Sequence, residues 1–194
     1  MTGFNGDAAQ PGQTGQAQDA TVQDATVQDA TVQDGTKDAL TRMTGLLAKV
    51  KSGGLTEAET AELAVILGGR VGGLDSTLGV RYISFLPEMV LELTVTRDHV
   101  QPWGITNGGV YASLGESAGS FAGFIAAGGH SSVMGVTNST NFLRPSVPGD
   151  VIRSTAHAVH TGRTSQLWRI DHVNATSGKL LATTELRTVV APRR

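Results

Sequence analysis

The spacing of apolar side chains separates a first stretch without periodicity from a second stretch with clear helix and strand patterns. From Gln18 the sequence reads QDATV three times and then QDG, so that one residue in five is apolar. A period of five fits neither the turn of a helix nor the alternation of a strand, and no face of such a segment can be buried. We therefore predict that residues 1–37 form a disordered leader. A solvated segment without a docking function is the simpler interpretation of this leader, and a docking function is the alternative.

Helical spacing begins near Asp38, which is a suitable N-cap residue. A second helix is expected after Thr56, because Thr56 and Glu59 have the spacing of a capping box. Together these helices should form an extension over residues 38–74 that covers an edge or an apolar face of the domain that follows. In the first helix, four apolar residues recur on one face: Leu40, Met43, Leu47 and Val50.

From residue 75 onward the pattern is mainly that of strands. A loop at Gln101–Gly109 precedes a single long helical segment, residues 110–127. Short turns join the last three strands, which indicates an antiparallel meander. The order predicts an α+β domain over residues 75–194, with one long helix against one antiparallel sheet. The expected strands are Gly79–Phe85, Met89–Thr96, Ser132–Phe142, Asp150–His160, Ser165–Asn174 and Lys179–Val190.

Small residues recur along one side of the expected helix, at Gly115, Gly119 and Gly123. A glycine in a helix interior costs about 1 kcal/mol, so the repeat indicates that the helix backbone approaches another surface closely. The spacing places Glu116 on this same glycine face, where we expect its carboxylate to be buried against a partner surface and to serve as a base or a nucleophile. Ser120 follows one turn later and can donate a hydrogen bond to that carboxylate.

Composition narrows the functional classes further. The chain has no cysteine, which excludes disulfides, a thiol nucleophile and thiolate metal sites, and the spacing of His, Asp and Glu suggests no metal site. A net charge of −2 argues against a nucleic-acid binder, and the apolar runs are too short for a membrane span. With no signal-peptide pattern at its start, a cytoplasmic protein is expected. Residues 1–38 hold six aspartates and one lysine, so the remainder carries a net charge of +3.

The loop QPWGITNGG places Gly108 where a helix begins, so its backbone N–H and the helix dipole point toward any group that docks there. Such a helix end can polarise a carbonyl oxygen. The residues alone leave simpler interpretations open, because a glycine pair usually marks an ordinary turn. Glu116 could equally pair with an arginine of a neighbouring strand.

Three separated motifs resemble one family. VQPWGITNGGVYASLGE, at Val100–Glu116, is similar to the signature of hotdog-fold acyl-CoA thioesterases, in the 4-hydroxybenzoyl-CoA and phenylacetate-degradation branch that carries Glu on the helix. NFLRPSVPGD at 141–150 and HTGRTSQLW at 160–168 resemble the next two landmarks. The resemblance covers residues 75–192. It implies a hotdog fold, a sheet wrapped around one long helix, and hydrolysis of an acyl-CoA without a cofactor other than the CoA of the substrate.

The resemblance also implies catalytic roles. Glu116 would act as nucleophile or general base, the Gly108 N–H would hold the thioester carbonyl, and Gln101 would contact the thioester or water. Ser120 takes the place of an assisting helix hydroxyl. Asn107 stands where the family usually has histidine, and an amide cannot carry a proton near neutral pH.

For CoA, the resemblance implies phosphate contacts from Arg144 and flanking contacts from Arg163 and Thr164, with Arg194 adding to the phosphate site. Guanidinium is the preferred partner of phosphate. The Gln and Gly part of each site and the Glu would come from different subunits, so a homodimer would be the smallest active unit and a dimer of dimers its expected assembly. Close helices at this interface would explain the glycines.

Two alternatives remain open in the sequence. One is a non-catalytic acyl-CoA-binding or regulatory protein, which Asn107 makes plausible. The other is a hydratase or dehydratase of the same fold, which would need a histidine beside its acid. The five histidines are expected to be surface or strand-paired residues: His99, His130, His157, His160 and His172. An acyl pocket, open to aromatic or medium-chain groups, is expected among Trp103, Tyr111, Phe121 and Phe142.

Overall fold

The computed structural model describes residues 34–69, 73–129 and 131–191. The QDATV repeat and Arg194 lie outside this range, as does His130. Among the helices in these three ranges, none has the length and apolar character needed to cross a membrane.

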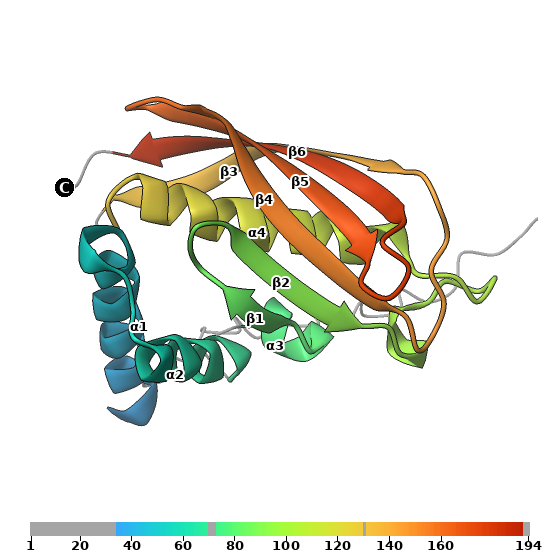
Figure 1. Ribbon diagram of the computed structural model, residues 1–194, viewed down its shortest axis with the longest axis horizontal. Coiled ribbons are helices and arrows are strands. Elements are labelled where there is room, and N and C mark those ends of the chain that lie inside the picture. Colours follow the sequence, from blue (N-terminus) through green and yellow to red (C-terminus); the bar gives the residue numbers. More distant parts are fainter. Residues whose placement is uncertain (1–33, 70–72, 130, 192–194) are drawn as a thin grey trace, which may run out of the picture. The chain divides into compact units, whose positions relative to one another are not determined.

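Six strands form one antiparallel sheet in the order β1-β2-β4-β5-β6-β3 (Figure 1). The strands predicted at Ser132–Phe142 and Ser165–Asn174 are found with the same bounds, and the expected meander of the last three strands is confirmed. Among the strands that the structure describes, β3 pairs only with β6 and is therefore an edge strand. The strands are β1 Arg81–Ser84, β2 Met89–Thr94, β3 Ser132–Phe142, β4 Val151–Thr161, β5 Ser165–Asn174 and β6 Leu180–Ala191.

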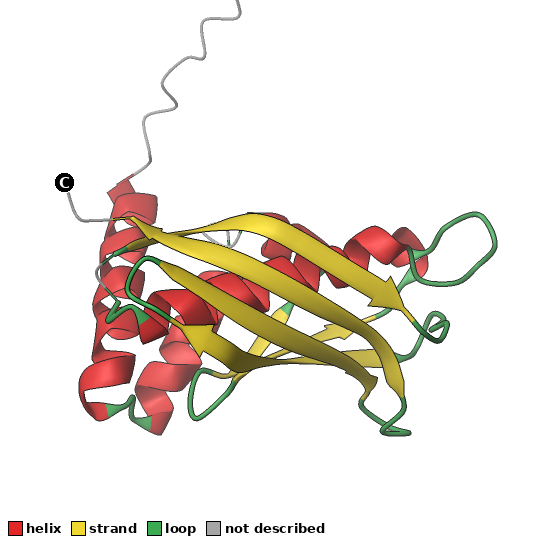
Figure 2. Cartoon of the chain, turned by 90° about the horizontal axis from the view of Figure 1, so that it is seen from above, coloured by secondary structure: helices red, strands yellow, loops and turns green. Residues whose placement is uncertain are grey.

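The long helix α4 spans Gly108–Ala126 and lies against the inner face of this sheet (Figure 2). It begins two residues earlier than the sequence predicts. The reason is a cap, because the side-chain Oδ1 of Asn107 accepts the Gly109 N–H at 2.8 Å. The expected α+β arrangement of one long helix and one antiparallel sheet is confirmed.

The glycine side of α4 packs against its own sheet. A Cβ atom on Gly115 would lie 2.6 Å from Cγ2 of Thr184, and one on Gly119 would lie 2.5 Å from Cδ2 of Leu186. Both neighbours belong to β6, and all three glycines are buried. The expectation that these glycines face the helix of a second subunit is therefore wrong, because the sheet of the same chain already covers them.

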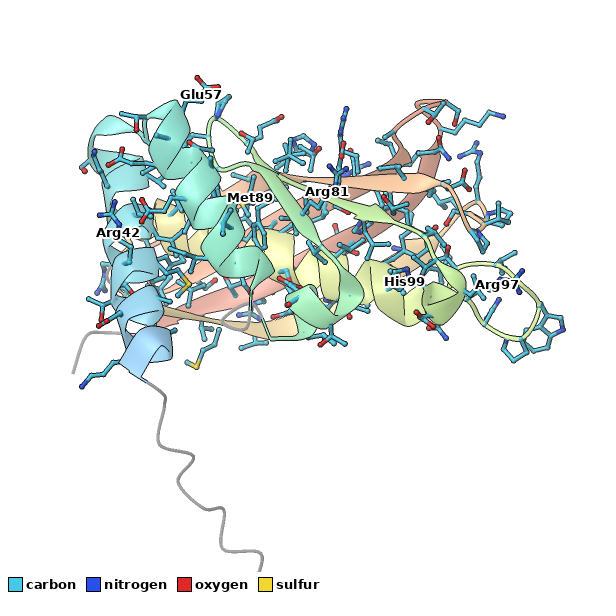
Figure 3. The ribbon with its side chains drawn as sticks, turned by 90° about the horizontal axis from the view of Figure 1, so that it is seen from below. Arg42, Glu57, Arg81, Met89, Arg97 and His99 are labelled. Atoms are coloured by element: carbon cyan, nitrogen blue, oxygen red, sulfur yellow. The ribbon has the colours of Figure 1, made fainter. Side chains whose placement is uncertain are left out.

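The N-terminal extension consists of two helices, α1 Asp34–Gly53 and α2 Glu57–Gly68. α1 begins before Asp38, so Asp38 is not its N-cap, whereas the capping box of Thr56 and Glu59 is confirmed. Buried leucine and valine side chains of α1 join the core, and α2 contacts β1. Figure 3 shows Arg42 and Glu57 of these helices at one end, far from Arg97 and His99, which precede α4.

A short helix, α3 Leu74–Leu78, was not predicted. Its Asp75 is buried and accepts hydrogen bonds from Tyr82 at 2.5 Å and from Ser117 of α4 at 2.7 Å. Burial beside this carboxylate raises the pKa of the Tyr82 hydroxyl. α3 thus ties β1 to the middle of α4 through polar contacts that leave no periodic signal in the sequence.

Candidate active site

Several backbone hydrogen bonds hold the loop that leads into α4. The Gln101 N–H donates to the Ile105 carbonyl at 2.9 Å, and the Asn107 N–H donates to the carbonyl of His99 at 2.8 Å. Because Asn107 caps the Gly109 N–H, the helix start is fixed by a side chain. Among the described residues, no acceptor is recorded for the N–H of Gly108, as is usual for the first helical amides.

A cavity of about 410 Å³ opens at this helix end. It brings together three of the predicted site residues, namely Gln101, Gly108 and Arg144. Arg144 is exposed and donates from its guanidinium to the Leu180 carbonyl at 2.7 Å, which holds the side chain along the cavity wall. The site thus offers a backbone donor, an amide side chain and a cation to one small molecule.

Of the four aromatic residues expected to form an acyl pocket, two line this cavity and two do not. Tyr111 and Phe142 line it, with ring centroids 6.1 Å apart. Trp103 is 81% exposed, and Phe121 packs edge-to-face on Tyr82 instead. A Cβ on Gly108 would lie 2.6 Å from Cζ of the Phe142 ring, so a larger residue there would require this exposed ring to shift.

Tyr111 is held by a polar contact that the sequence did not reveal. Its hydroxyl lies 2.7 Å from Oγ of Ser146, which in turn lies 2.6 Å from Oγ1 of Thr106. All three residues are buried, and burial raises the pKa of the Tyr111 hydroxyl. Tyr111 is therefore held in the cavity wall from the core, and its hydroxyl stays neutral at ordinary pH.

Glu116 lies in the middle of α4 and is half-buried against the edge strand β3. Ser120 donates to its Oε1 at 3.3 Å, which confirms the predicted contact. Asn138 of β3 donates from Nδ2 to its Oε2 at 3.3 Å, a partner that the sequence did not indicate. The carboxylate touches the backbone at Gly135, where a Cβ atom would collide with it.

The two halves of the predicted site are far apart within one chain. Glu116 follows Gly108 by eight residues of continuous helix, a separation of about 12 Å along the axis. Glu116 does not line the cavity that contains Gln101 and Gly108. A single carbonyl group therefore cannot contact both the Gly108 N–H and the Glu116 carboxylate of the same chain.

The predicted CoA-binding residues are also divided. Arg163 lies in the turn between β4 and β5, where it lines a cavity of about 470 Å³ with Ala126 and Ala127 at the C-terminal end of α4. Thr164 shares this turn, and its carbonyl accepts the Val190 N–H. Arg144 is at the opposite end of the helix, and Arg194 lies outside the described residues.

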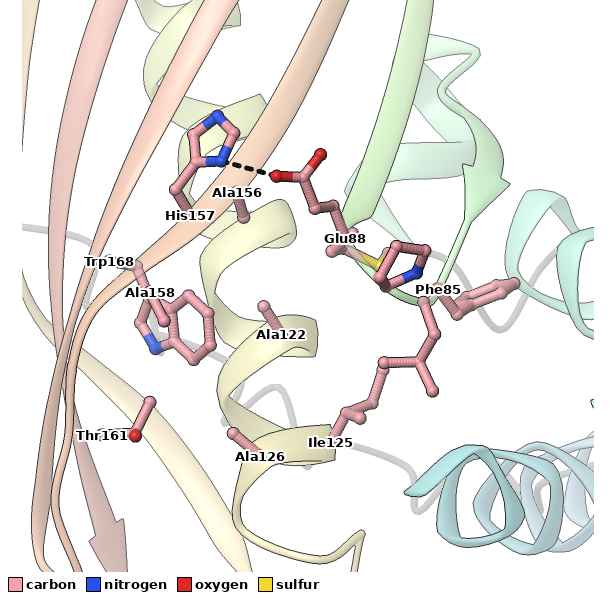
Figure 4. A pocket seen from close by; sticks show the side chains of 13 residues that line it. Phe85, Glu88, Ala122, Ile125, Ala126, Ala156, His157, Ala158, Thr161 and Trp168 are labelled. Carbon is pink, nitrogen blue, oxygen red and sulfur yellow. Dashed lines mark hydrogen bonds and ion pairs between the residues drawn. The ribbon is translucent and has the colours of Figure 1, made fainter. Parts of the chain in front are cut away.

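A larger cavity, of about 610 Å³, contains none of the predicted catalytic or CoA-binding residues (Figure 4). Its floor is formed by the C-terminal half of α4, with Ala122 and Ile125, and Trp168 of β5 forms one wall. At its rim Nδ1 of His157 lies 2.9 Å from the Glu88 carboxylate. Its size alone does not make it the reaction site, because the polar groups suited to thioester chemistry lie elsewhere.

The expectation of a surface or strand-paired residue is wrong for His99, which is buried in the short 3-10 helix Arg97–His99. A second buried histidine is His172. It belongs to β5, but its ring is completely buried between Ser154 and Thr184 and packs edge-on to Tyr111 at 5.7 Å. Burial lowers its pKa to about 4. Within the described ranges, no three His, Asp or Glu side chains gather as a metal site.

Comparisons with known proteins show which family the chain resembles. Residues 104–180 match the family model described as thioesterase superfamily. The proofreading thioesterase EntH of Cronobacter turicensis is 36% identical over 123 residues, which cover 62% of this chain and 87% of that protein. The 1,4-dihydroxy-2-naphthoyl-CoA hydrolase of Escherichia coli is 31% identical over 125 residues, covering 63% and 87%. The crystal structure of S. sahachiroi AziG is similar with a TM-score of 0.60 and 35% identity, covering 63% of this chain and 98% of that one.

Proposed function

Because this chain belongs to the thioesterase superfamily, we propose that it hydrolyses an acyl-CoA thioester to the free acid and CoA, with residues 75–194 as the catalytic domain. The observation that carries the proposal is the cavity at the start of α4. There the unsatisfied N–H of Gly108 points from a helix N-terminus, and Gln101 and Arg144 stand beside it. Two relatives are named for thioester hydrolysis, which supports the same reaction class.

Gly108 has the chemistry to stabilise the reaction. Its N–H donates to the thioester carbonyl oxygen, which becomes negatively charged when the carbonyl carbon is attacked. A donor fixed on a helix end needs no reorganisation, and loss of one such donor commonly lowers kcat by about 10²–10³. Gln101 contacts the thioester or the attacking water from the same cavity.

Glu116 would act from a second copy of the chain. The separation of about 12 Å from Gly108 supports this, because in the proposed reaction both groups reach one carbonyl. The edge strand β3 provides a surface for the second copy, since most of its eleven residues are exposed, Met134 and Val136 among them. A long open edge is a template for pairing with another chain. We therefore propose a homodimer as the smallest active unit.

The carboxylate completes the hydrolysis by one of two balanced routes. In the nucleophilic route, Glu116 attacks the carbonyl carbon, expels the CoA thiolate and forms an anhydride that water then cleaves. In the general-base route, Glu116 takes a proton from a water molecule that attacks the carbonyl carbon directly. Each route consumes one water and yields one acid and one CoA. Single turnover in ¹⁸O-water identifies the anhydride route when water attacks the glutamyl carbonyl carbon, because label then enters the Glu116 carboxylate, which the general-base route leaves unlabelled.

Arg144 would bind a phosphate of CoA beside the thioester, as its place on the cavity wall allows. Arg163 and Thr164 lie at the other end of α4, so they would reach the same CoA only from a second chain. The same dimer that joins Gly108 to Glu116 would therefore also assemble the phosphate contacts.

The test is steady-state hydrolysis of a panel of aryl- and fatty acyl-CoAs by the full chain. We expect Glu116→Gln to lower kcat by about 10²–10⁴, the usual contribution of a positioned base or nucleophile. The control is Glu57→Gln, which changes an exposed carboxylate on α2 and should leave kcat unchanged. Near wild-type turnover by Glu116→Gln would contradict the proposal.

One observation favours a second candidate, a non-catalytic acyl-CoA-binding protein. Asn107 replaces the histidine usual in the family, and its side-chain oxygen is engaged in capping α4. The position thus supplies no group that can shuttle a proton. Binding of acyl-CoA without hydrolysis across the whole panel would support this second candidate and reject the first.

A further inference from the structure

A continuous series of side-chain hydrogen bonds runs from the buried core to Glu116. Nε2 of His172 lies 2.9 Å from Oγ1 of Thr184, which lies 2.8 Å from Oγ1 of Thr140. Thr140 contacts Oδ1 of Asn138 at 3.1 Å, and Asn138 contacts Glu116. The series crosses strands β5, β6 and β3 in turn and ends on α4.

Asn138 fixes the direction of these hydrogen bonds. Its Nδ2 donates to the Ala112 carbonyl at 3.0 Å and to Oε2 of Glu116 at 3.3 Å. A carbonyl and a carboxylate can only accept, so the amide group cannot be turned around. Oδ1 of Asn138 must therefore be the atom that faces Thr140, and it accepts the Thr140 hydroxyl proton.

The same reasoning determines each later step. Since the proton of Thr140 is used, the Thr184 hydroxyl must donate to Thr140. Since the proton of Thr184 is then used, Nε2 of His172 must carry a proton and donate it to Thr184. Nδ1 of His172 is left without a proton and accepts from Oγ of Ser154, 2.7 Å away. Every partner is satisfied only by this one neutral form of the ring.

Two glycines leave the space that the series needs. Gly135 of β3 lets the Glu116 carboxylate lie directly on the strand, where any Cβ would displace it. Gly115 lets Thr184 approach the helix, because a Cβ would lie 2.7 Å from the threonine Oγ1. His172, Thr184 and Ser154 are fully buried, so water does not compete for the inner half of the series.

We propose that His172, Thr184, Thr140 and Asn138 are positioning residues that hold the Glu116 carboxylate in its reactive orientation, an inference that rests on the proposed function of Glu116. Ser120 holds one carboxylate oxygen from α4, while Asn138 holds the other from β3. The side chain is thus clamped from two elements. A misplacement of about 1 Å at a reacting group can cost 10²-fold in rate, so a remote clamp has a measurable effect.

The decisive comparison uses two buried threonines on the same face of β6. Thr184→Val removes the hydroxyl at the centre of the series. Thr188→Val removes an equally buried hydroxyl, which donates to Gln166 at 3.2 Å and, within the part of the chain that the structure describes, does not belong to the series that ends on Glu116. We expect Thr184→Val to lower kcat by about 10- to 100-fold with little change in KM, Thr184→Ser to restore it, and Thr188→Val to retain it. Equal kcat losses in both valine variants would overturn the proposal.

Two further measurements keep this proposal separate from the proposed function. If Glu116→Gln hydrolyses acyl-CoA at the wild-type rate, the catalytic role of Glu116 fails, whatever the threonine variants do. If Glu116→Gln is inactive but Thr184→Val is not impaired, only the positioning role fails. A long-range ¹H–¹⁵N spectrum of the wild-type protein should show His172 protonated on Nε2 alone. Protonation on Nδ1 would contradict the direction of the series.

Discussion

Two sides of the helix α4 have opposite surroundings. On one side Gly115, Gly119 and Gly123 meet β5 and β6 so closely that no Cβ would fit. On the other side Glu116, which accepts a hydrogen bond from Ser120, meets β3, an edge strand whose residues are mostly exposed. The glycine side is covered by the sheet of the same chain. The second side offers a polar group and an open strand edge, as expected of a surface that needs another molecule.

This difference separates two uses of small residues on a helix. The glycines allow the helix to approach its sheet closely. The cost of glycine to helix stability is offset by the packing of β6 side chains such as Leu186. Gly135 makes no such contribution to the core, because it is exposed and its missing Cβ leaves space only for a carboxylate. A close approach in the core therefore indicates packing, whereas a close approach at an exposed edge indicates a site.

The strongest test of the open side mixes two inactive variants. Gln101→Ala and Glu116→Gln should each be nearly inactive, yet their co-refolded mixture should recover about a quarter of the wild-type rate. Half of the dimers are then mixed, and each mixed dimer has one site with both residues intact. The rate of the mixture is measured against each variant refolded alone. A mixture as inactive as its components would show that Gln101 and Glu116 act within one chain.

The packed side is tested by filling one glycine. Gly119→Ala places a Cβ against Leu186, so the free energy of unfolding should fall by about 1–3 kcal/mol. Gly45→Ala is the matched control in helix α1, where no atom lies within 4 Å of the added carbon, and it should raise stability by about 1 kcal/mol. Denaturant unfolding measures both. A neutral Gly119→Ala would mean that α4 is less closely packed on its sheet than described.

A pH prediction concerns His172, which lies beneath the packed side. Its folded pKa of about 4 is below the usual value near 6.5, mainly because burial disfavours the charged ring, with Asp171 opposing weakly. The unfolded chain therefore binds the proton first as pH falls. Between pH 7 and pH 5 this should cost about 2 kcal/mol of unfolding free energy. His172→Gln should lack this part of the pH dependence, and equal losses in both proteins would contradict it.

The smallest expected effect on stability concerns Asn107, the N-cap residue of α4. Asn107→Ala removes the cap on the Gly109 N–H and should lower the free energy of unfolding by about 1 kcal/mol. Asn107→Ser keeps a capping oxygen and should lose only a small part of this, as measured by thermal unfolding. If both variants also keep the wild-type kcat, the side chain serves the helix and not the reaction.

Sequence patterns predicted the framework of this molecule well and its contacts incompletely. Spacing along the chain was sufficient for local features, namely the bounds of β3 and β5, the Thr56 capping box and the contact of Ser120 with Glu116. The surface that contacts the glycine side was predicted wrongly, because glycine spacing indicates a close approach but does not identify the element that approaches. Asn138 resembles any exposed polar residue of an edge strand, and only the folded chain places it against Glu116, 22 residues earlier.

The distance of about 12 Å between Gly108 and Glu116 bears on when the protein becomes active after its synthesis. Under the proposed division of the site, a newly made chain carries two half-sites and can hydrolyse nothing alone. Synthesis and activity would then be separate events, joined only when two copies meet. Dilution would switch the enzyme off without unfolding it, and local accumulation would switch it on without any chemical modification.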